Sequence, residues 1–188
     1  MKALNKVMAA SSLVSAAYKL GSEAHTDQKR KYTGTPYFDH CCEVANLVAS
    51  IGASEDAVAA ALLHDTVEDV KTITQETIAT NISPRVADLV MMCTDVSKPE
   101  DGNRKARKAK DLAHTAEADA EGQTIKLADI ISNSVNILGN DPAFSKVYIP
   151  EMMNLLTVLT KGDKRLYEIA SAYVKNGEQH LKLIGSLK

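Results

Sequence analysis

The stretch Ala59-Ala-Ala-Leu-Leu-His64-Asp65-Thr-Val-Glu68-Asp69 is the part of the sequence around which we expect the fold to form. An apolar run leads directly into four ionisable side chains within six residues. On one helix His64 and Glu68 lie a turn apart, as do Asp65 and Asp69, so all four project from the same end of the segment. Three carboxylates this close repel one another unless a cation or a basic side chain lies among them. The stretch indicates either a metal site at the end of a buried helix or a solvated helix end with a chance cluster.

Length and composition are those of an ordinary globular protein. The chain has 188 residues, 45% hydrophobic and 24% charged, so we expect one domain over residues 1–188. A net charge of −2 gives no general electrostatic case for nucleic acid or a membrane surface as partner. The 3 cysteines form no Cys-x-x-Cys pair, which favours reduced thiols and a cytoplasmic location. The sequence is compatible with a homo-oligomer but does not define the oligomeric state.

Helical periodicity runs through nearly the whole chain, and the alternation typical of half-buried strands is absent from the sequence. Ser54 and Ser83 are expected N-caps, and Gly122 is expected to interrupt the pattern. We predict an all-α bundle of about eight to ten helices. The expected helices cover residues 3–25, 37–50, 54–69, 74–80, 84–92, a segment starting at 104, 123–138, 143–159 and 163–174.

Four side chains on these helices suit a divalent cation: His40, His64, Asp65 and Asp129. A mixed set of imidazole and carboxylate donors fits manganese, iron or zinc better than calcium, which prefers oxygen ligands. Four protein ligands on an octahedral ion would leave two positions for water and substrate, as metal-assisted hydrolysis requires. Taken singly, each residue has an ordinary structural explanation: Asp129 as a surface or capping residue and His40 as a first-turn histidine.

The order His, His-Asp, Asp, with each part on a helix, resembles the HD phosphohydrolase superfamily. Three segments narrow the resemblance to the hydrolase domain of RelA/SpoT homologues, and the length is similar to that of the small alarmone hydrolases, including the metazoan SpoT-homologue type. The resemblance covers roughly residues 16–173. Its segments are Arg30-Lys31-Tyr-Thr-Gly34-Thr-Pro36-Tyr37-Phe-Asp-His40, Ala61-Leu-Leu-His64-Asp65-Thr-Val-Glu68-Asp69 and Lys126-Leu-Ala-Asp129-Ile-Ile-Ser-Asn133.

This resemblance implies an all-helical HD domain that removes the 3′-pyrophosphate of (p)ppGpp with a manganese ion. By motif position, the residues expected to hold the metal are His40, His64, Asp65 and Asp129. Glu68 and Asp69 are expected to orient and deprotonate the attacking water or to protonate the leaving 3′ oxygen. The residues expected to bind the nucleotide substrate are Arg30, Lys31, Asn133, Asn136, Lys146 and Tyr148.

Two basic stretches could meet the negative charges of such a substrate. The first, Lys29-Arg30-Lys31, belongs to the motif; the second, from Arg104 to Lys110, is more typical of a solvated helix face, since Lys and Arg are mostly exposed. No synthetase segment is recognised, so we expect degradation only.

Ile130, Ile131 and Ser132 depart from the basic or large residues that the family usually has after the aspartate. The departure leaves base selectivity open. An enzyme acting on (p)ppApp or a nucleoside monophosphate is the first alternative. A non-catalytic nucleotide-binding HD module is the second, although the intact ligand set and the Glu68-Asp69 pair argue against it.

Overall fold

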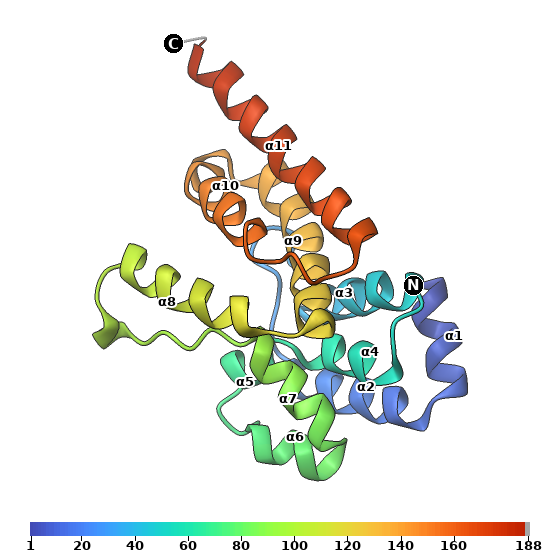
Figure 1. Cartoon of the computed structure of the whole chain (residues 1–188). Helices are drawn as coiled ribbons and strands as arrows, with labels where there is room; N and C mark the ends of the chain where they lie inside the picture. Colours follow the sequence, from blue (N-terminus) through green and yellow to red (C-terminus); the bar gives the residue numbers. More distant parts are fainter. Residues whose placement is uncertain (187–188) are drawn as a thin grey trace.

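The computed structural model describes residues 1–186, which fold as packed helices (Figure 1). Within that range the only β-type pairing is an isolated bridge between Lys29 and Pro36, so the predicted all-α class is confirmed. The α-helices are α1 (Lys2–Ala10), α2 (Ser12–Ala24), α3 (Phe38–Ser50), α4 (Glu55–Leu63), α5 (Thr66–Asp69), α6 (Gln75–Asn81), α7 (Pro84–Cys93), α8 (Arg104–Glu117), α9 (Ala120–Asn140), α10 (Pro142–Leu156) and α11 (Lys164–Ser186). A short 3₁₀ helix, η1, covers Pro99–Asp101.

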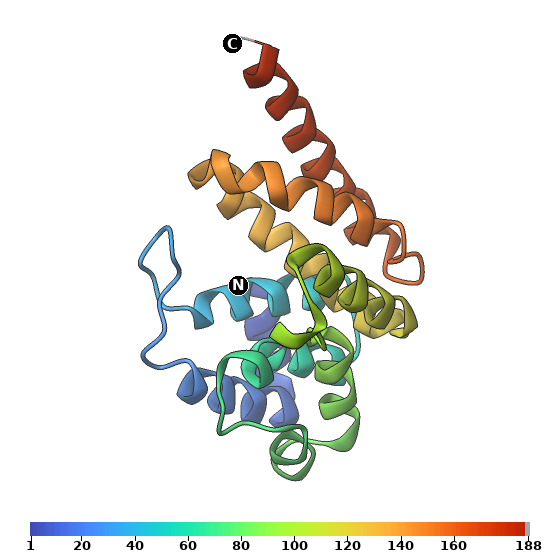
Figure 2. The ribbon, with the colours of Figure 1, turned by 90° about the vertical axis from the view of Figure 1, so that its left-hand side faces the viewer.

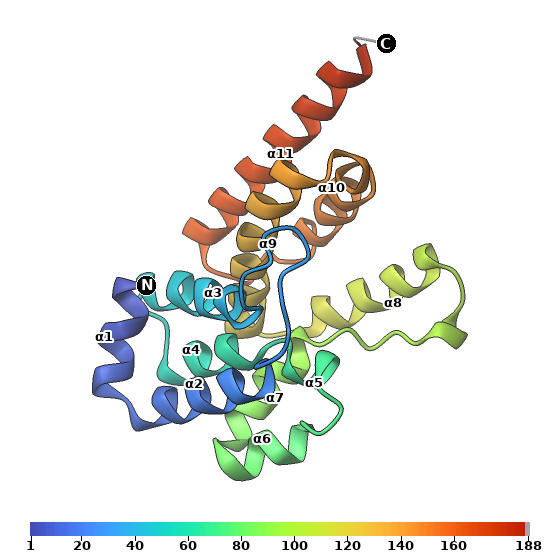
Figure 3. The ribbon, with the colours of Figure 1, turned by 180° about the vertical axis from the view of Figure 1, so that it is seen from behind.

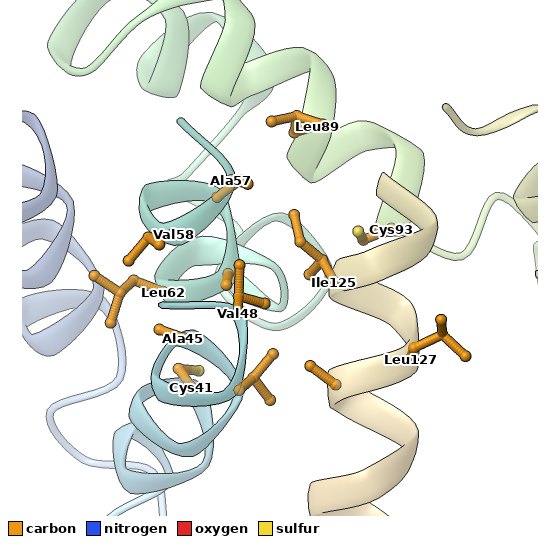
Figure 4. Packing of buried hydrophobic residues seen from close by; sticks show 14 of the residues in the cluster. Cys41, Ala45, Val48, Ala57, Val58, Leu62, Leu89, Cys93, Ile125 and Leu127 are labelled. Carbon is orange, nitrogen blue, oxygen red and sulfur yellow. The ribbon is translucent and has the colours of Figure 1, made fainter. Parts of the chain in front are cut away.

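The core lies where α3, α4, α7 and α9 meet, and Figure 4 shows apolar side chains of these helices in the space between them. Every residue of α4 from Ala57 to Leu63 is completely buried. Its alanines allow the neighbouring helices to approach closely. Ser54 caps this helix as predicted, because its hydroxyl oxygen accepts a hydrogen bond from the amide of Ala57 at 3.1 Å. A buried helix therefore leads directly to His64.

The predicted helix over residues 3–25 is wrong at one point, since it consists of α1 and α2. Ser11 has an extended backbone (φ −123°, ψ 117°) and separates them. Its hydroxyl donates to Glu55 Oε2 at 2.6 Å and accepts from the amide of Val14, so it caps α2 while tying it to the start of α4. The apolar periodicity continues across the break, which explains why the sequence reads as one helix.

The central helix also differs from the prediction, because it stops at Leu63 and restarts as α5 at Thr66. His64 and Asp65 occupy the junction between α4 and α5. Adjacent residues of a continuous helix project in different directions and do not face each other. At this junction, however, Nε2 of His64 and Oδ2 of Asp65 lie 3.2 Å apart.

Two further boundaries are corrected in the second half of the chain. Gly122 does not interrupt a helix; it lies in the first turn of α9, which begins after the N-cap Asp119. A Cβ at this position would lie 3.1 Å from Cβ of Met92, so the glycine allows α9 to pack closely on α7. The last helix runs to Ser186, well beyond the predicted end at 174.

Two parts of the chain lie around the site, the connection between α2 and α3 and helix α8. The connection between α2 and α3, residues 25–37, passes over α9, as the view from behind shows (Figure 3). Helix α8 extends away from the main body, and the turned view places it in front of the helices around α9 (Figure 2).

None of the described helices is both long and apolar enough to cross a membrane.

Candidate metal centre and substrate pocket

Two histidines and two aspartates that are distant in sequence converge in the structure. His40 comes from the first turn of α3, and Asp129 from the middle of α9. Nε2 of His40 lies 3.2 Å from Oδ1 of Asp129 and 3.5 Å from Oδ2 of Asp65. Nε2 of His64 lies 3.7 Å and 3.2 Å from the same two oxygens. The structure thus brings together all four residues that the sequence predicts as ligands.

The second nitrogen of each imidazole is held by a hydrogen bond. His64 Nδ1 lies 2.9 Å from the carbonyl oxygen of Ala61, which can only accept, so Nδ1 carries the proton. His40 Nδ1 lies 2.9 Å from Oγ of Ser132, and that hydroxyl donates to Oε2 of Glu43 at 2.6 Å. Because the hydroxyl proton is used there, Ser132 accepts from His40 Nδ1. Neutral imidazoles in these tautomers present a lone pair on Nε2.

This donor set fits a divalent cation. Nε2 of His40 and of His64 are both buried and lack a hydrogen-bond partner, while they face two carboxylates. Burial by itself lowers the pKa of His64, but the negative charges of Asp65 and Asp129 outweigh it and raise this pKa to about 9, so the position favours a positive charge, either a proton or a metal cation. A cation at this position would satisfy both lone pairs and both carboxylates.

Two residues without a predicted role hold the aspartates in place. The hydroxyl of Tyr37 donates to Oδ2 of Asp65 at 2.7 Å. Burial, and then the charge of Asp65, raise the pKa of Tyr37, so it remains a donor. Nζ of Lys126 lies 3.9 Å from Oδ2 of Asp129 and donates to the carbonyl of Cys93. Lys126 is three residues before Asp129 on α9, a spacing that could have indicated the pair.

Glu68 and Asp69 follow the metal donors on α5. Oε1 of Glu68 accepts from the amide of Asp95 at 2.6 Å. Although Glu68 is exposed to solvent, protein atoms around its carboxylate displace part of the water there, and this desolvation raises its pKa to about 7, against the opposing charge of Lys126. Burial, followed by the charge of Asp65, also raises the pKa of Asp69. Both carboxylates therefore bind protons more readily than ordinary ones.

The donors open onto a pocket with a volume of about 720 Å³, which is within the range of small-molecule sites. Its inner end contains Asp65, Glu68 and Asp129, and its outer walls come from α8 and α10. The charged side chains that line it are Asp65, Glu68, Asp95, Arg104, Lys105, Lys108, Asp111, Lys126, Asp129, Lys146 and Glu151. The carboxylates beside the histidines suit a cation, and the basic side chains of α8 and α10 suit a phosphorylated ligand next to it.

Comparison with known proteins agrees with this geometry. A family model described as HD domain matches residues 17–141, about two thirds of the chain. The chain belongs to the HD domain family. A metazoan orthologue of SpoT, described as hydrolysing ppGpp, shares the fold of this HD domain with a TM-score of 0.79 and 23% identity, over 91% of this chain and 97% of its own.

Curated relatives confirm the resemblance to RelA/SpoT homologues. The probable GTP diphosphokinase RSH3 of Arabidopsis thaliana, a chloroplast protein, is 34% identical over 160 residues, which are 82% of this chain and 22% of the relative. The guanosine-3′,5′-bis(diphosphate) 3′-pyrophosphohydrolase of Aquifex aeolicus is 38% identical over 117 residues, 62% of this chain and 16% of the relative. This HD domain spans about a fifth of the length of these relatives.

The second basic stretch, from Arg104 to Lys110, lies on α8 and is more than the solvated helix face that the sequence suggests. Arg104, Lys105 and Lys108 line the pocket instead of facing only open solvent. Arg104 donates to both carboxylate oxygens of Glu151 on α10, at 2.7 and 2.8 Å, and Lys108 pairs with Asp95 at 2.5 Å. The sequence indicates the charge of this helix, but only the packing shows which of its sides faces the pocket.

Three of the predicted substrate residues line the pocket of the HD domain: Asn133, Lys146 and Tyr148. The amide of Asn133 donates to Oδ1 of Asp129 at 2.6 Å, which places this side chain beside the metal donors. Tyr148 is buried, and its hydroxyl lies 3.2 Å from Oγ of Ser134 and donates to the carbonyl of Ile130.

The other three predicted substrate residues, Arg30, Lys31 and Asn136, are not among the residues that line the pocket. Lys31 is 74% exposed and pairs with Asp141 at 3.3 Å. Arg30 is 9% exposed and donates to Glu43 at 3.0 Å. With the amide of Asn136 turned so that its oxygen faces the guanidinium, that oxygen accepts from Nε and Nη2 of Arg30 at 3.0 Å each. Their role in substrate binding stays a prediction.

Proposed function

We propose that this chain is a manganese-dependent (p)ppGpp 3′-pyrophosphohydrolase, which converts guanosine alarmones to GDP or GTP and pyrophosphate. The observation that carries the proposal is the convergence of His40, His64, Asp65 and Asp129 at the inner end of a pocket that also contains Glu68. Membership of the HD domain family supports it, as does the name of the relative from Aquifex aeolicus.

His40, His64, Asp65 and Asp129 would hold the metal, and manganese accepts this mixture of nitrogen and oxygen donors. A bound divalent cation would supply Lewis acidity, which lowers the pKa of water and polarises a phosphoryl oxygen. Tyr37 and Lys126 would keep the two carboxylates oriented toward this position, because each contacts the oxygen of an aspartate.

Glu68 is the proposed proton acceptor for the attacking water. A base with a pKa of about 7 can take up a proton near neutral pH and release it again. The water oxygen attacks the phosphorus that is attached to the 3′ oxygen. The bond between that phosphorus and the 3′ oxygen breaks, and the released pyrophosphate contains the oxygen of the water. The 3′ oxygen takes up a proton as it departs, and Asp69, whose pKa is also raised, is the proposed partner in orienting the water or donating that proton.

The remaining lining residues are proposed to bind the nucleotide. Asn133 lies beside Asp129 and would contact the nucleoside. Lys146 would meet phosphate oxygens on the side of α10, and Tyr148, whose hydroxyl already donates to the carbonyl of Ile130, would line the same side without donating to the substrate. Arg104, Lys105 and Lys108 on α8 would neutralise the more distant phosphates, since a substrate with several negative charges needs local basic groups in a protein whose net charge is −2.

We further propose that the protein works in the cytoplasm, where thiols such as those of Cys41, Cys42 and Cys93 stay reduced. Base preference is the main alternative within this proposal. Ile130 lines the pocket where the family usually has a basic or large residue, so (p)ppApp is a reasonable competing substrate.

Purified, metal-free protein should be tested with ppGpp, pppGpp, ppApp, GMP and AMP, each with Mn²⁺, Mg²⁺, Zn²⁺ or no added metal. Release of pyrophosphate from ppGpp that depends on Mn²⁺ is the expected result. Faster release from ppApp would reassign the base. Nucleotide binding without turnover, under conditions where the metal binds, would identify a non-catalytic module and contradict the proposal.

A further inference from the structure

A chain of hydrogen bonds connects the predicted metal ligand His40 with a side chain that lies outside the pocket. From the inside outwards, His40 Nδ1 donates to Oγ of Ser132 at 2.9 Å, and that hydroxyl donates to Oε2 of Glu43 at 2.6 Å. The same oxygen of Glu43 accepts from Nη1 of Arg30 at 3.0 Å. Three elements are joined in this way: α3, α9 and the connection before α3.

The direction of each bond in this chain is determined by the chemistry of its members. A guanidinium only donates and an ionised carboxylate only accepts, so Glu43 must receive both the proton of Arg30 and that of Ser132. Ser132 is then left with its oxygen lone pairs facing the imidazole. His40 therefore keeps its proton on Nδ1, and Nε2 stays free to face Asp65 and Asp129.

The two histidines of the centre differ in how they are held. His64 donates to the carbonyl of Ala61 in its own helix, so its orientation follows from the backbone of α4. His40 depends on side chains alone, and Glu43 at the outer end is 51% exposed. A half-exposed carboxylate moves between rotamers unless a partner holds it. Arg30, which is 9% exposed and also bound by Asn136, is that partner.

We propose that Arg30, Glu43 and Ser132 are positioning residues that keep His40 in the tautomer and orientation required for cation binding. The inference rests on the metal site of the proposed function. It assigns Arg30 a role that differs from the predicted binding of the nucleotide substrate, and it agrees with the placement of Arg30 and Asn136, which face each other and do not line the pocket.

The test measures metal binding without substrate. Metal-free wild-type protein and variants are titrated with Mn²⁺, and free Mn²⁺ is followed by its electron paramagnetic resonance signal. Ser132→Ala should weaken binding about 10- to 100-fold, because removing a group that orients a ligating histidine has effects of this size. Glu43→Ala should weaken it by up to about tenfold, and Arg30→Ala by less.

Two variants serve as matched controls. Glu43→Gln keeps an oxygen where Arg30 and Ser132 both donate, so it should retain most of the affinity that Glu43→Ala loses. Lys31→Ala removes the neighbouring basic side chain, which contacts Asp141 and Tyr32 and not this chain of bonds, so it should bind Mn²⁺ like the wild type. Circular dichroism of each metal-free variant shows that the helices are intact.

The outcomes separate this inference from the proposed function. If the wild type binds Mn²⁺ and hydrolyses ppGpp, but Ser132→Ala and Glu43→Ala bind the metal equally well, the positioning role is wrong and the proposed function stands. If Arg30→Ala raises KM and leaves metal affinity unchanged, Arg30 is a substrate contact as the sequence predicts. A wild-type protein that binds no divalent metal would overturn both.

Discussion

The two walls of the pocket are built by different means. The inner wall, from Asp65, α5 and α9, is backed by two histidines that are 1% exposed and is held by hydrogen bonds between distant parts of the chain. The outer wall, from α8 and α10, carries exposed basic side chains held by ion pairs such as Arg104–Glu151. Chemistry at phosphorus needs donor atoms at defined positions, whereas attraction of phosphates works over longer distances. Each wall is suited to one of these tasks.

The difference predicts separable effects on catalysis, binding and stability. Changes in the inner wall should alter turnover and metal affinity together. Changes in the outer wall should alter mainly KM, because exposed ion pairs contribute only about 0–1 kcal/mol each to stability.

Removal of the metal should have the largest effect. Chelation, or Asp129→Asn, should lower kcat/KM for ppGpp by at least about 10³-fold, since it removes both the Lewis acid and its orientation of the reactants. Added Mn²⁺ at about 100 times its Kd should raise the stability of the wild type by about 2.7 kcal/mol, measured by thermal unfolding. Asp88→Asn, an aspartate on α7 outside the pocket, is the control and should behave like the wild type. Full activity of chelated protein would contradict the metal site.

Loss of the proposed base comes next. Glu68→Gln should lower kcat about 10²- to 10⁴-fold, the usual contribution of general acid–base catalysis, while Mn²⁺ affinity stays near that of the wild type. Single-turnover assays together with a metal titration check both parts. A variant that loses metal affinity and activity in parallel would instead identify Glu68 as a metal ligand.

The pH dependence should show an acidic limb that belongs to Glu68. Its pKa is raised to about 7, so the carboxylate is protonated and inactive as a base below that pH, and kcat/KM should rise as the pH increases through about 7. In the Glu68→Gln variant this limb should disappear from the residual activity. A limb at the ordinary pKa of a glutamate, about 4.3, would show that the pocket does not desolvate this group.

The outer wall should give the smallest effects. Arg104→Ala and Lys108→Ala should each raise KM for ppGpp by up to about tenfold with kcat nearly unchanged, and should change unfolding free energy by no more than about 1 kcal/mol. Lys110→Ala is the matched control, because Lys110 is on the same helix but pairs with Asp101 outside the pocket. A KM effect of Lys110→Ala as large as the others would indicate only a general field of positive charge.

Local patterns in the sequence determined most of the helices and the candidate donors. Ser54 and Ser83 cap α4 and α7 as predicted, because capping involves residues only three positions apart. The order of His40, His64-Asp65 and Asp129 was sufficient to nominate a metal site, because imidazole and carboxylate groups together are donors that divalent transition metals accept.

Only the tertiary structure decided the break at His64–Asp65, the side of α8 that faces the pocket and the link from Arg30 to His40. Each depends on contacts between residues far apart in the chain: Ser132 is 92 positions from His40, and Arg104 is 47 from Glu151. Helical periodicity and capping depend on residues within one or two turns of each other, so the sequence predicts them. The partner of a polar side chain depends on how whole helices pack, which local patterns do not show.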